Sequence, residues 1–185
     1  MLAIISMLRG VNVLGHNQIK MDTLRALYES LKFTGCQTYI NSGNVVFCTS
    51  ERDLAALPAR IEKAIECKFG FRPSVIHRTT AEMRDVIARN PFAKRRNIEP
   101  GKLLIGFLAS DPDKEALAKV RAMKIEPEEL HSSGRELYMY FPNGMGRSKL
   151  PWSTLDRALK TPLTGRNWNS VTKLLAMAEK LESPQ

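Results

Sequence analysis

The sequence has few residues of the kinds that hold metal ions. It contains only three cysteines and three histidines, and their spacing matches neither a CxxC redox pair nor a zinc site. We therefore expect no metal, no cofactor, and reduced cysteine thiols packed in the core. The residues concerned are Cys36, Cys48, Cys67, His16, His77 and His131.

Long apolar runs are also missing. The first eight residues are mostly apolar, but no basic run precedes them and Arg9 ends the segment, so we expect neither a signal peptide nor a membrane span. This predicts a cytoplasmic protein with no membrane partner. A nucleophile elbow and a paired-carboxylate signature are absent as well, so the sequence settles neither an enzymatic activity nor the oligomeric state.

Acidic residues are scarce relative to basic ones. The chain of 185 residues carries 28 Lys and Arg against 19 Asp and Glu, a formal net charge of +9. Such a charge gives the surface a positive potential that attracts phosphates and anionic polymers. The excess is concentrated in residues 144–173, where Asp156 is the single acid. The basic residues there are Arg147, Lys149, Arg157, Lys160, Arg166 and Lys173.

The first half of the chain alternates between strand and helix patterns. Apolar runs and period-2 segments predict strands, apolar spacings of three and four predict helices, and Ser42-Gly43-Asn44 is typical of a hairpin turn. Thr79 and Glu82 form a capping box at the start of the third helix. The expected strands are 3–9, 36–41, 45–49 and 73–78, and the expected helices are 21–31, 54–69 and 79–90.

The second half repeats this order. A strand over 102–109, a helix over 111–123, a hairpin over 125–141 and a helix over 152–159 follow one another. Residues 161–165 hold too many breakers for a central strand, and an amphipathic helix over 171–181 ends the chain. The order predicts an α+β protein of two fused ferredoxin-like (βαββαβ) subdomains, the second with a degraded last strand and a C-terminal helix.

A Pro- and Gly-containing segment separates the two halves. The expected division is a subdomain over 1–91, a linker over 92–101 and a second subdomain over 102–185. The basic run Lys94-Arg95-Arg96 within the linker is most simply explained as solvated.

The connection after the first strand is the first candidate site. Arg9, Asn12, His16, Asn17 and Lys20 are able to bind a phosphate or a base, with Gly10 and Gly15 allowing backbone amides close to the ligand. The structural alternative is that the two asparagines satisfy the loop's own backbone and that the histidine is simply exposed.

Two further stretches lie in the basic C-terminal part. Gly146, Arg147, Ser148 and Lys149 follow a strand and lead toward a helix, an arrangement that suits an anion but that glycines in a plain connection also explain. Residues 166–169 place a tryptophan between two amides beside an arginine, which suits stacking on a base, although helix capping explains them equally. These residues are Arg166, Asn167, Trp168 and Asn169.

Several segments resemble a bacterial family known as domain of unknown function 1697. Leu14 stands where that family usually has a second glycine, and Asn41 where it often has glutamine. The resemblance implies two fused ferredoxin-like subdomains and no particular activity. The segments that carry it are 8–21 (LRGVNVLGHNQIKM), 39–47 (YINSGNVVF), 146–150 (GRSKL) and 166–169 (RNWN).

Two functional hypotheses follow. The first is a non-enzymatic protein that binds nucleic acid or another polyanion along its basic, Gly- and Asn-rich loops; the sheet-face signature of ferredoxin-like RNA binders is absent. The second is an enzyme or sensor for a small phosphorylated or carboxylated metabolite held by Arg9, Asn12, Arg147 and Arg166. We expect the three stretches to form the walls of one anion site; convergence of the arginines on a concave pocket favours a metabolite, whereas an open stripe favours a polymer. A third alternative is a surface that serves only solubility or an acidic protein partner.

Overall fold

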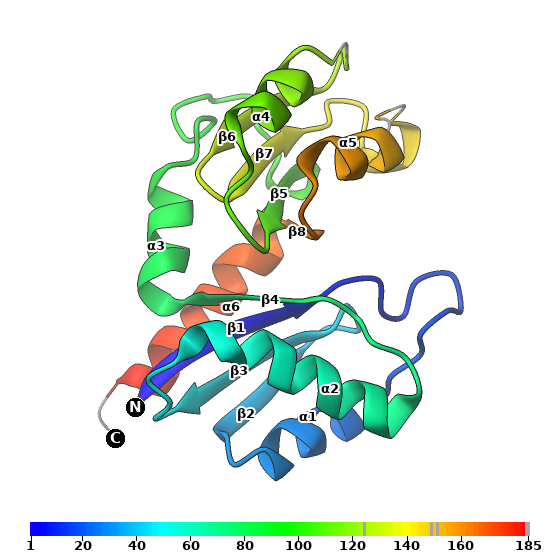
Figure 1. The fold of residues 1–185 in the computed structure, drawn as a ribbon. Coiled ribbons are helices and arrows are strands. Elements are labelled where there is room, and N and C mark those ends of the chain that lie inside the picture. The colour runs from blue at the N-terminus through cyan, green and yellow to red at the C-terminus, as the bar shows by residue number, and fades with distance from the viewer. Residues whose placement is uncertain (124, 149, 151, 184–185) are drawn as a thin grey trace. The chain divides into compact units, whose positions relative to one another are not determined.

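The computed structural model describes residues 1–123, 125–148, 150 and 152–183, without the side chains of Trp152 and Ser153. The chain forms a mixed α+β structure with two four-stranded antiparallel sheets (Figure 1). It divides into two compact units. Unit 1 comprises residues 1–84 and 173–185, and unit 2 comprises residues 85–172.

Unit 1 is built around its first strand. The sheet order is β2-β3-β1-β4, with β1 antiparallel to both neighbours. Six of the seven residues of β1 are buried, as expected for a central strand covered on both faces. The strands are β1 (Leu2–Leu8), β2 (Thr34–Tyr39), β3 (Asn44–Thr49) and β4 (Val75–Thr79).

Helices α1 (Met21–Ser30) and α2 (Leu57–Phe69) pack on one face of this sheet (Figure 1). Their apolar faces and alternate strand residues form one core, centred on Tyr28, Phe33 and Phe47. A short 3₁₀ turn, η1 (Leu54–Ala56), leads into α2 and is capped by Asp53. The predicted hairpin around Gly43 is confirmed, since β2 and β3 pair directly.

Unit 2 has the same connectivity. Its sheet order is β6-β7-β5-β8, with β5 antiparallel to both neighbours. Helices α4 (Lys114–Arg121) and α5 (Trp152–Leu159) pack on one face through residues such as Val120 and Leu155. The strands are β5 (Leu103–Leu108), β6 (Glu129–Ser133), β7 (Glu136–Tyr140) and β8 (Leu163–Asn167), with 3₁₀ turns η2 (Pro100–Lys102) and η3 (Met145–Arg147).

The last strand of unit 2 corrects the prediction of a degraded strand. β8 is a five-residue strand paired with β5 from Leu163 to Asn167. It forms an edge of its sheet, and an edge strand tolerates a preceding proline and an internal glycine. Gly165 stands opposite Gly106, and a Cβ on Gly165 would lie 3.0 Å from a methyl of Leu104. The breaker-rich composition therefore reflects close packing.

The unit boundaries also differ from the expected division. They fall within α3 (Thr80–Ala88) and α6 (Trp168–Glu182), so the last part of the C-terminal helix belongs to unit 1. There Ala3 N donates to Glu182 Oε1 at 3.1 Å. The expected linker 92–101 lies in unit 2, and its Arg95 guanidinium sits 5.5 Å from the Phe92 ring centroid and 2.7 Å from Glu129. All three residues of this basic run are exposed, as expected, and Arg95 also has these side-chain partners.

Candidate functional site

The connection from β1 to α1 contains a tight turn near its middle (blue in Figure 1). Val13 and His16 form an isolated β-bridge, and His16 N donates to Val13 O at 2.9 Å. Leu14 and Gly15 between them both have positive φ, at 48° and 82°. This is the φ pattern of a type I′ turn, the geometry that closes a two-residue hairpin.

Asn12 organises the base of this loop. Its Nδ2 donates to Ile19 O at 3.0 Å and to Asn41 O at 2.9 Å, while its Oδ1 accepts from Ile19 N at 2.8 Å. Asn17 Nδ2 donates to Gly10 O at 3.0 Å. The two asparagines therefore satisfy loop backbone groups, which is the structural alternative foreseen from the sequence. The Asn12 contacts also join the loop to the turn between β2 and β3.

A hollow of about 490 Å³ opens between these two loops. Its size lies within the range of small-molecule sites, roughly 300–1,000 Å³. Ile19 is buried at its base, whereas Gln18 and Lys20 are exposed. Lys20 is also the N-cap residue of α1, and its side chain makes no capping hydrogen bond. The lining residues are Asn12, Gly15, Gln18, Ile19, Lys20 and Asn41.

The connection before α1 carries cations but no acid, while Asp22 follows it in the first turn of the helix. Residues 9–21 contain Arg9, His16 and Lys20 but no acid, and residues 34–49 contain no charged residue. The start of α1 adds partial positive charge, which the carboxylate of Asp22 in its first turn partly offsets. The lining of the hollow therefore supplies amide groups and one ammonium group, a set that favours an anionic or polar ligand.

The predicted residues of this loop differ in exposure. Gly10, His16, Asn17 and Lys20 are exposed, and Arg9 and Asn12 are half-buried. Arg9 is held by its backbone, because Arg9 N donates to Ser74 O at 2.9 Å. Of the predicted side chains of this loop, the exposed Lys20 and the half-buried Asn12 line the hollow.

The second predicted stretch forms the 3₁₀ turn η3 after β7. Gly146 and Arg147 are exposed there, and Ser148 Oγ accepts from Leu150 N at 3.0 Å. Lys149 lies outside the described residues. Arg147 is therefore the cation that this turn presents to solvent within the described part of the stretch.

The third predicted stretch is the end of β8 and the start of α6. Arg166 is only 6% exposed, and its Nη1 donates to Thr164 Oγ1 and to Gly165 O, both at 2.8 Å. Burial lowers the pKa of Arg166 to about 10. Asn167 Oδ1 accepts from Ser170 N at 2.9 Å as the cap of α6, while Trp168 is half-buried and Asn169 exposed. Arg166 and Asn167 thus have structural partners.

Strand register places the second and third stretches at one end of the sheet of unit 2. β7 and β8 both run antiparallel to β5, with Tyr140 opposite Leu103 and Asn167 opposite Leu104. The segments after Tyr140 and Asn167 therefore leave from the same end. The opening loop leaves the sheet of unit 1 at the end of β1, beside the starts of β3 and β4. Its convergence with the other two stretches stays a prediction.

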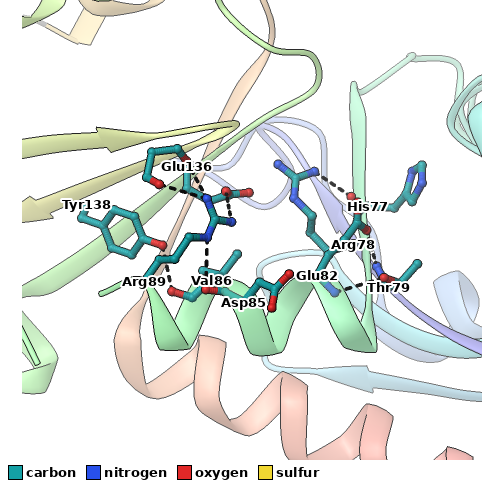
Figure 2. Close-up of polar contacts among 10 residues, drawn as sticks. His77, Arg78, Thr79, Glu82, Asp85, Val86, Arg89, Glu136 and Tyr138 are labelled. Carbon is teal, nitrogen blue, oxygen red and sulfur yellow. Dashed lines mark hydrogen bonds and ion pairs between the residues drawn. The ribbon is translucent and has the colours of Figure 1, made fainter. Parts of the chain in front are cut away.

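Sequence reasoning missed a matching residue in unit 1. Arg78 of β4 stands opposite Ile5, as Arg166 of β8 stands opposite Ile105. Arg78 is 1% exposed, and its Nη1 donates to the carbonyl of the preceding residue, His77, at 2.7 Å (Figure 2). Each arginine precedes a helix cap. The sequence signal that could have revealed Arg78 is that His77-Arg78-Thr79 and Gly165-Arg166-Asn167 both place an arginine directly before a helix cap.

The caps after the two arginines are equivalent in position. Thr79 N donates to Glu82 Oε2 at 2.8 Å and Glu82 N donates to Thr79 Oγ1 at 3.2 Å, which confirms the predicted capping box (Figure 2). Asn167 occupies the corresponding place before α6. Both units therefore end their sheets with a buried arginine followed by a capped helix.

A second polar cluster lies within unit 2, around the end of α3. Arg89 Nη2 contacts Glu136 Oε2 at 3.1 Å, and Glu136 is only 3% exposed (Figure 2). Tyr138 OH donates to Val86 O at 2.8 Å, and burial raises the pKa of Tyr138 to about 12. These groups are satisfied by one another, as buried polar groups generally are.

Within the described ranges, no three His, Cys, Asp or Glu side chains lie close enough together to hold a metal ion. Among the same residues, none of the helices has the length and apolar composition to cross a bilayer.

Fold and site together define a two-unit α+β protein whose first unit carries a polar hollow between two loops. The chain belongs to the family described as protein of unknown function (DUF1697), which matches residues 1–138. The conserved bacterial protein SP0830 from Streptococcus pneumoniae has a similar structure, with a TM-score of 0.72 and 22% identity. The similarity covers 96% of this chain and 98% of that chain and concerns the fold. No curated protein matches the chain.

Proposed function

We propose that this protein is a non-enzymatic binder of nucleic acid or a related polyanion, and that it binds through the opening loop of unit 1. The observation that carries the proposal is the hollow of about 490 Å³ beside the connection 9–20, which contains cations but no acid. Lys20 supplies a cation, while Gln18 and Asn41 supply further polar lining. Phosphate contacts by lysine and by helix N-termini are the usual basis of sequence-independent binding.

The net charge supports a polymeric ligand. A formal charge of +9 on 185 residues attracts a polyanion over a wide surface and not only at one hollow. Exposed cations outside the loop, such as Arg147 in unit 2, then add to the affinity. Arg166 is not part of this proposal, because its guanidinium is buried against its own strand.

The proposal includes a finer assignment of fold and location. The order β4-β1-β3-β2 in unit 1 and its equivalent in unit 2 support ferredoxin-like subdomains that arose by duplication. Three free cysteines, two of them buried, suit the reducing cytoplasm. Burial raises the pKa of Cys36 to about 11, so this thiol is protonated and unreactive at neutral pH.

Fluorescence anisotropy with labelled single-stranded and duplex oligonucleotides tests the proposal. We expect binding that weakens steeply as salt increases, and Lys20→Gln should weaken it about tenfold and reduce the salt slope by about 1. Lys114→Gln is the matched control, because Lys114 is exposed at the start of the corresponding helix α4. Absence of binding to any oligonucleotide at low salt would refute the proposal.

A small phosphorylated metabolite is the second candidate, favoured by the ligand-sized volume of the hollow. A thermal-shift screen with nucleotides and sugar phosphates distinguishes the two, because a ligand of the folded state raises its stability by mass action. Stabilisation by a monomeric phosphate, lost in Lys20→Gln, together with no oligonucleotide binding would assign the hollow to a metabolite.

A further inference from the structure

The two loops that border the hollow carry exposed aliphatic side chains at their tips. Leu14 is 93% exposed, Val13 53% and Ile40 52%. Large apolar residues with such exposure are few among the described residues, and three of the six lie here. A group of exposed apolar residues beside a polar hollow marks an interaction surface.

Two of these aliphatic residues also have an unfavourable backbone conformation. Leu14 and Ile40 both have φ of 48°, in the left-handed region that glycine and asparagine occupy with little strain. A β-branched residue such as isoleucine is especially unfavourable there. Leu14 and Ile40 are thus unfavourable both in backbone conformation and in solvent exposure. Residues with such backbone strain cluster at functional sites.

The tips are held in place relative to each other. Asn12 Nδ2 bridges the two loops by donating to Ile19 O and Asn41 O. The strand ends are tied as well, since Leu8 N donates to Gly43 O at 2.9 Å. Leu14 is adjacent in sequence to Gly15, which lines the hollow, so the apolar tip and the hollow adjoin.

The chemistry around the tips selects the occupant. Residues 9–20 carry Arg9, His16 and Lys20 with no acid, which is complementary to phosphates. Residues 9–20 and 40–43 contain no Phe, Tyr or Trp, so these loops lack large aromatic platforms for stacking, and His16 is their one ring. Aliphatic residues flanked by cations and amides instead match the wedges that enter stacked base steps from the minor groove. Leucine and valine are under-represented at hot spots of protein interfaces.

We propose that Leu14 is a wedge that inserts between stacked bases of a nucleic-acid duplex, and that the adjoining hollow receives the displaced nucleotide. Lys20 and the start of α1 then face its phosphate, and Gln18 and Asn41 face the base edge. The inference rests on the proposed function, because it names the ligand class of the same loop. It adds that binding unstacks the duplex.

A duplex carrying 2-aminopurine tests the wedge, because the emission of this base increases when it is unstacked. Full-length protein at saturating concentration should raise the emission. Leu14→Asn, which suits the left-handed φ, should bind the duplex within about twofold of the wild type, because phosphate contacts dominate affinity, yet lose the increase. Met145→Asn is the control, since Met145 is 43% exposed in unit 2 and should leave the increase unchanged.

The outcomes separate the wedge from the proposed function. Duplex binding without an emission increase, or an increase retained in Leu14→Asn, overturns the wedge and leaves the binding function intact. No binding to duplex or single strand overturns both. Sedimentation with vesicles containing anionic lipid provides a further arm: vesicle binding lost in Leu14→Asn, with no change in 2-aminopurine emission, would assign the tip to a bilayer instead.

Discussion

The two units share strand order and register but differ in the connection after the first strand. In unit 1 this connection runs from residue 9 to residue 20 and forms a turn, a hollow and an exposed apolar tip. In unit 2 the connection from β5 to α4 occupies only residues 109–113 and ends in the Asp113 cap, whose Oδ1 accepts from Ala116 N at 2.6 Å.

The last strands of the two units, β4 and β8, are in contrast alike. Arg78 and Arg166 occupy equivalent positions, are both buried, and both donate to the carbonyl of the preceding residue. A feature kept in both units serves the fold that they share. The extended opening loop, found in one unit only, is where a difference in function is expected.

The first and largest expected effect concerns these arginines. Arg78→Ala and Arg166→Ala should each lower the free energy of unfolding by about 3 kcal/mol, because each leaves buried acceptors without their donor. Urea denaturation followed by circular dichroism measures this, with exposed Arg52→Ala as a near-neutral control. A loss confined to one of the two positions would break the equivalence.

The second prediction concerns the opening loop, which only unit 1 has. Asn12→Ala removes three hydrogen bonds that tie the loops together and should cost about 2 kcal/mol of stability. Asn17→Ala removes one exposed bond and should cost at most about 1 kcal/mol. Oligonucleotide affinity should fall with Asn12→Ala more than with Asn17→Ala. Equal affinities in the two variants would show that loop order does not support binding.

The third prediction compares the units at alkaline pH. Tyr138 of unit 2 has its pKa raised to about 12, so its stabilising contribution is complete below pH 10, its ordinary value, and is lost as the pH rises through about 12. Cys36 of unit 1, raised from 9.0 to about 11, loses its contribution at lower pH, between about 9 and 11.

Denaturation at successive pH values measures both groups. Tyr138→Phe should lose about 1 kcal/mol at neutral pH with its bond to Val86 O. It should then show a shallower fall in stability above pH 10. Cys36→Ala should flatten the fall from pH 9 onward. An unchanged alkaline slope in both variants would exclude these groups as its cause.

The smallest expected effect concerns unit 2 and its exposed cation. Arg147→Gln should weaken oligonucleotide binding about threefold, less than Lys20→Gln, because one exposed phosphate contact contributes little. Anisotropy titrations at a single low salt concentration compare the two variants. A loss for Arg147→Gln larger than that for Lys20→Gln would move the main site to unit 2.

Much of the fold was predictable because local patterns and tertiary structure agree. The hairpin at Gly43 and the capping box of Thr79 and Glu82 follow from turn and cap chemistry, which is set by neighbouring residues. The strand β8 was missed because its glycine reflects contact with Leu104 on another strand, and sequence patterns do not register such contacts.

The candidate site was less predictable for the same reason. Arg166 read as an exposed anion ligand, and only its register in the sheet shows that it is buried. Asn12 was a candidate ligand, but its partners include Asn41, which is distant in sequence. Lys20 was among the predicted residues and lines the hollow, whereas the contribution of Asn41 from the other loop depends on tertiary structure.

The return of the chain to unit 1 has a consequence for synthesis. Residues 173–185 complete the unit that residues 1–84 begin, through Glu182 at Ala3 and through Leu181, which would lie 3.0 Å from a Cβ on Gly35. During synthesis, residues 1–84 therefore emerge before unit 2, and residues 173–185 of unit 1 emerge after it. Unit 2 has all its residues earlier, and a nascent chain that stops before residue 173 leaves part of the first sheet without its helix.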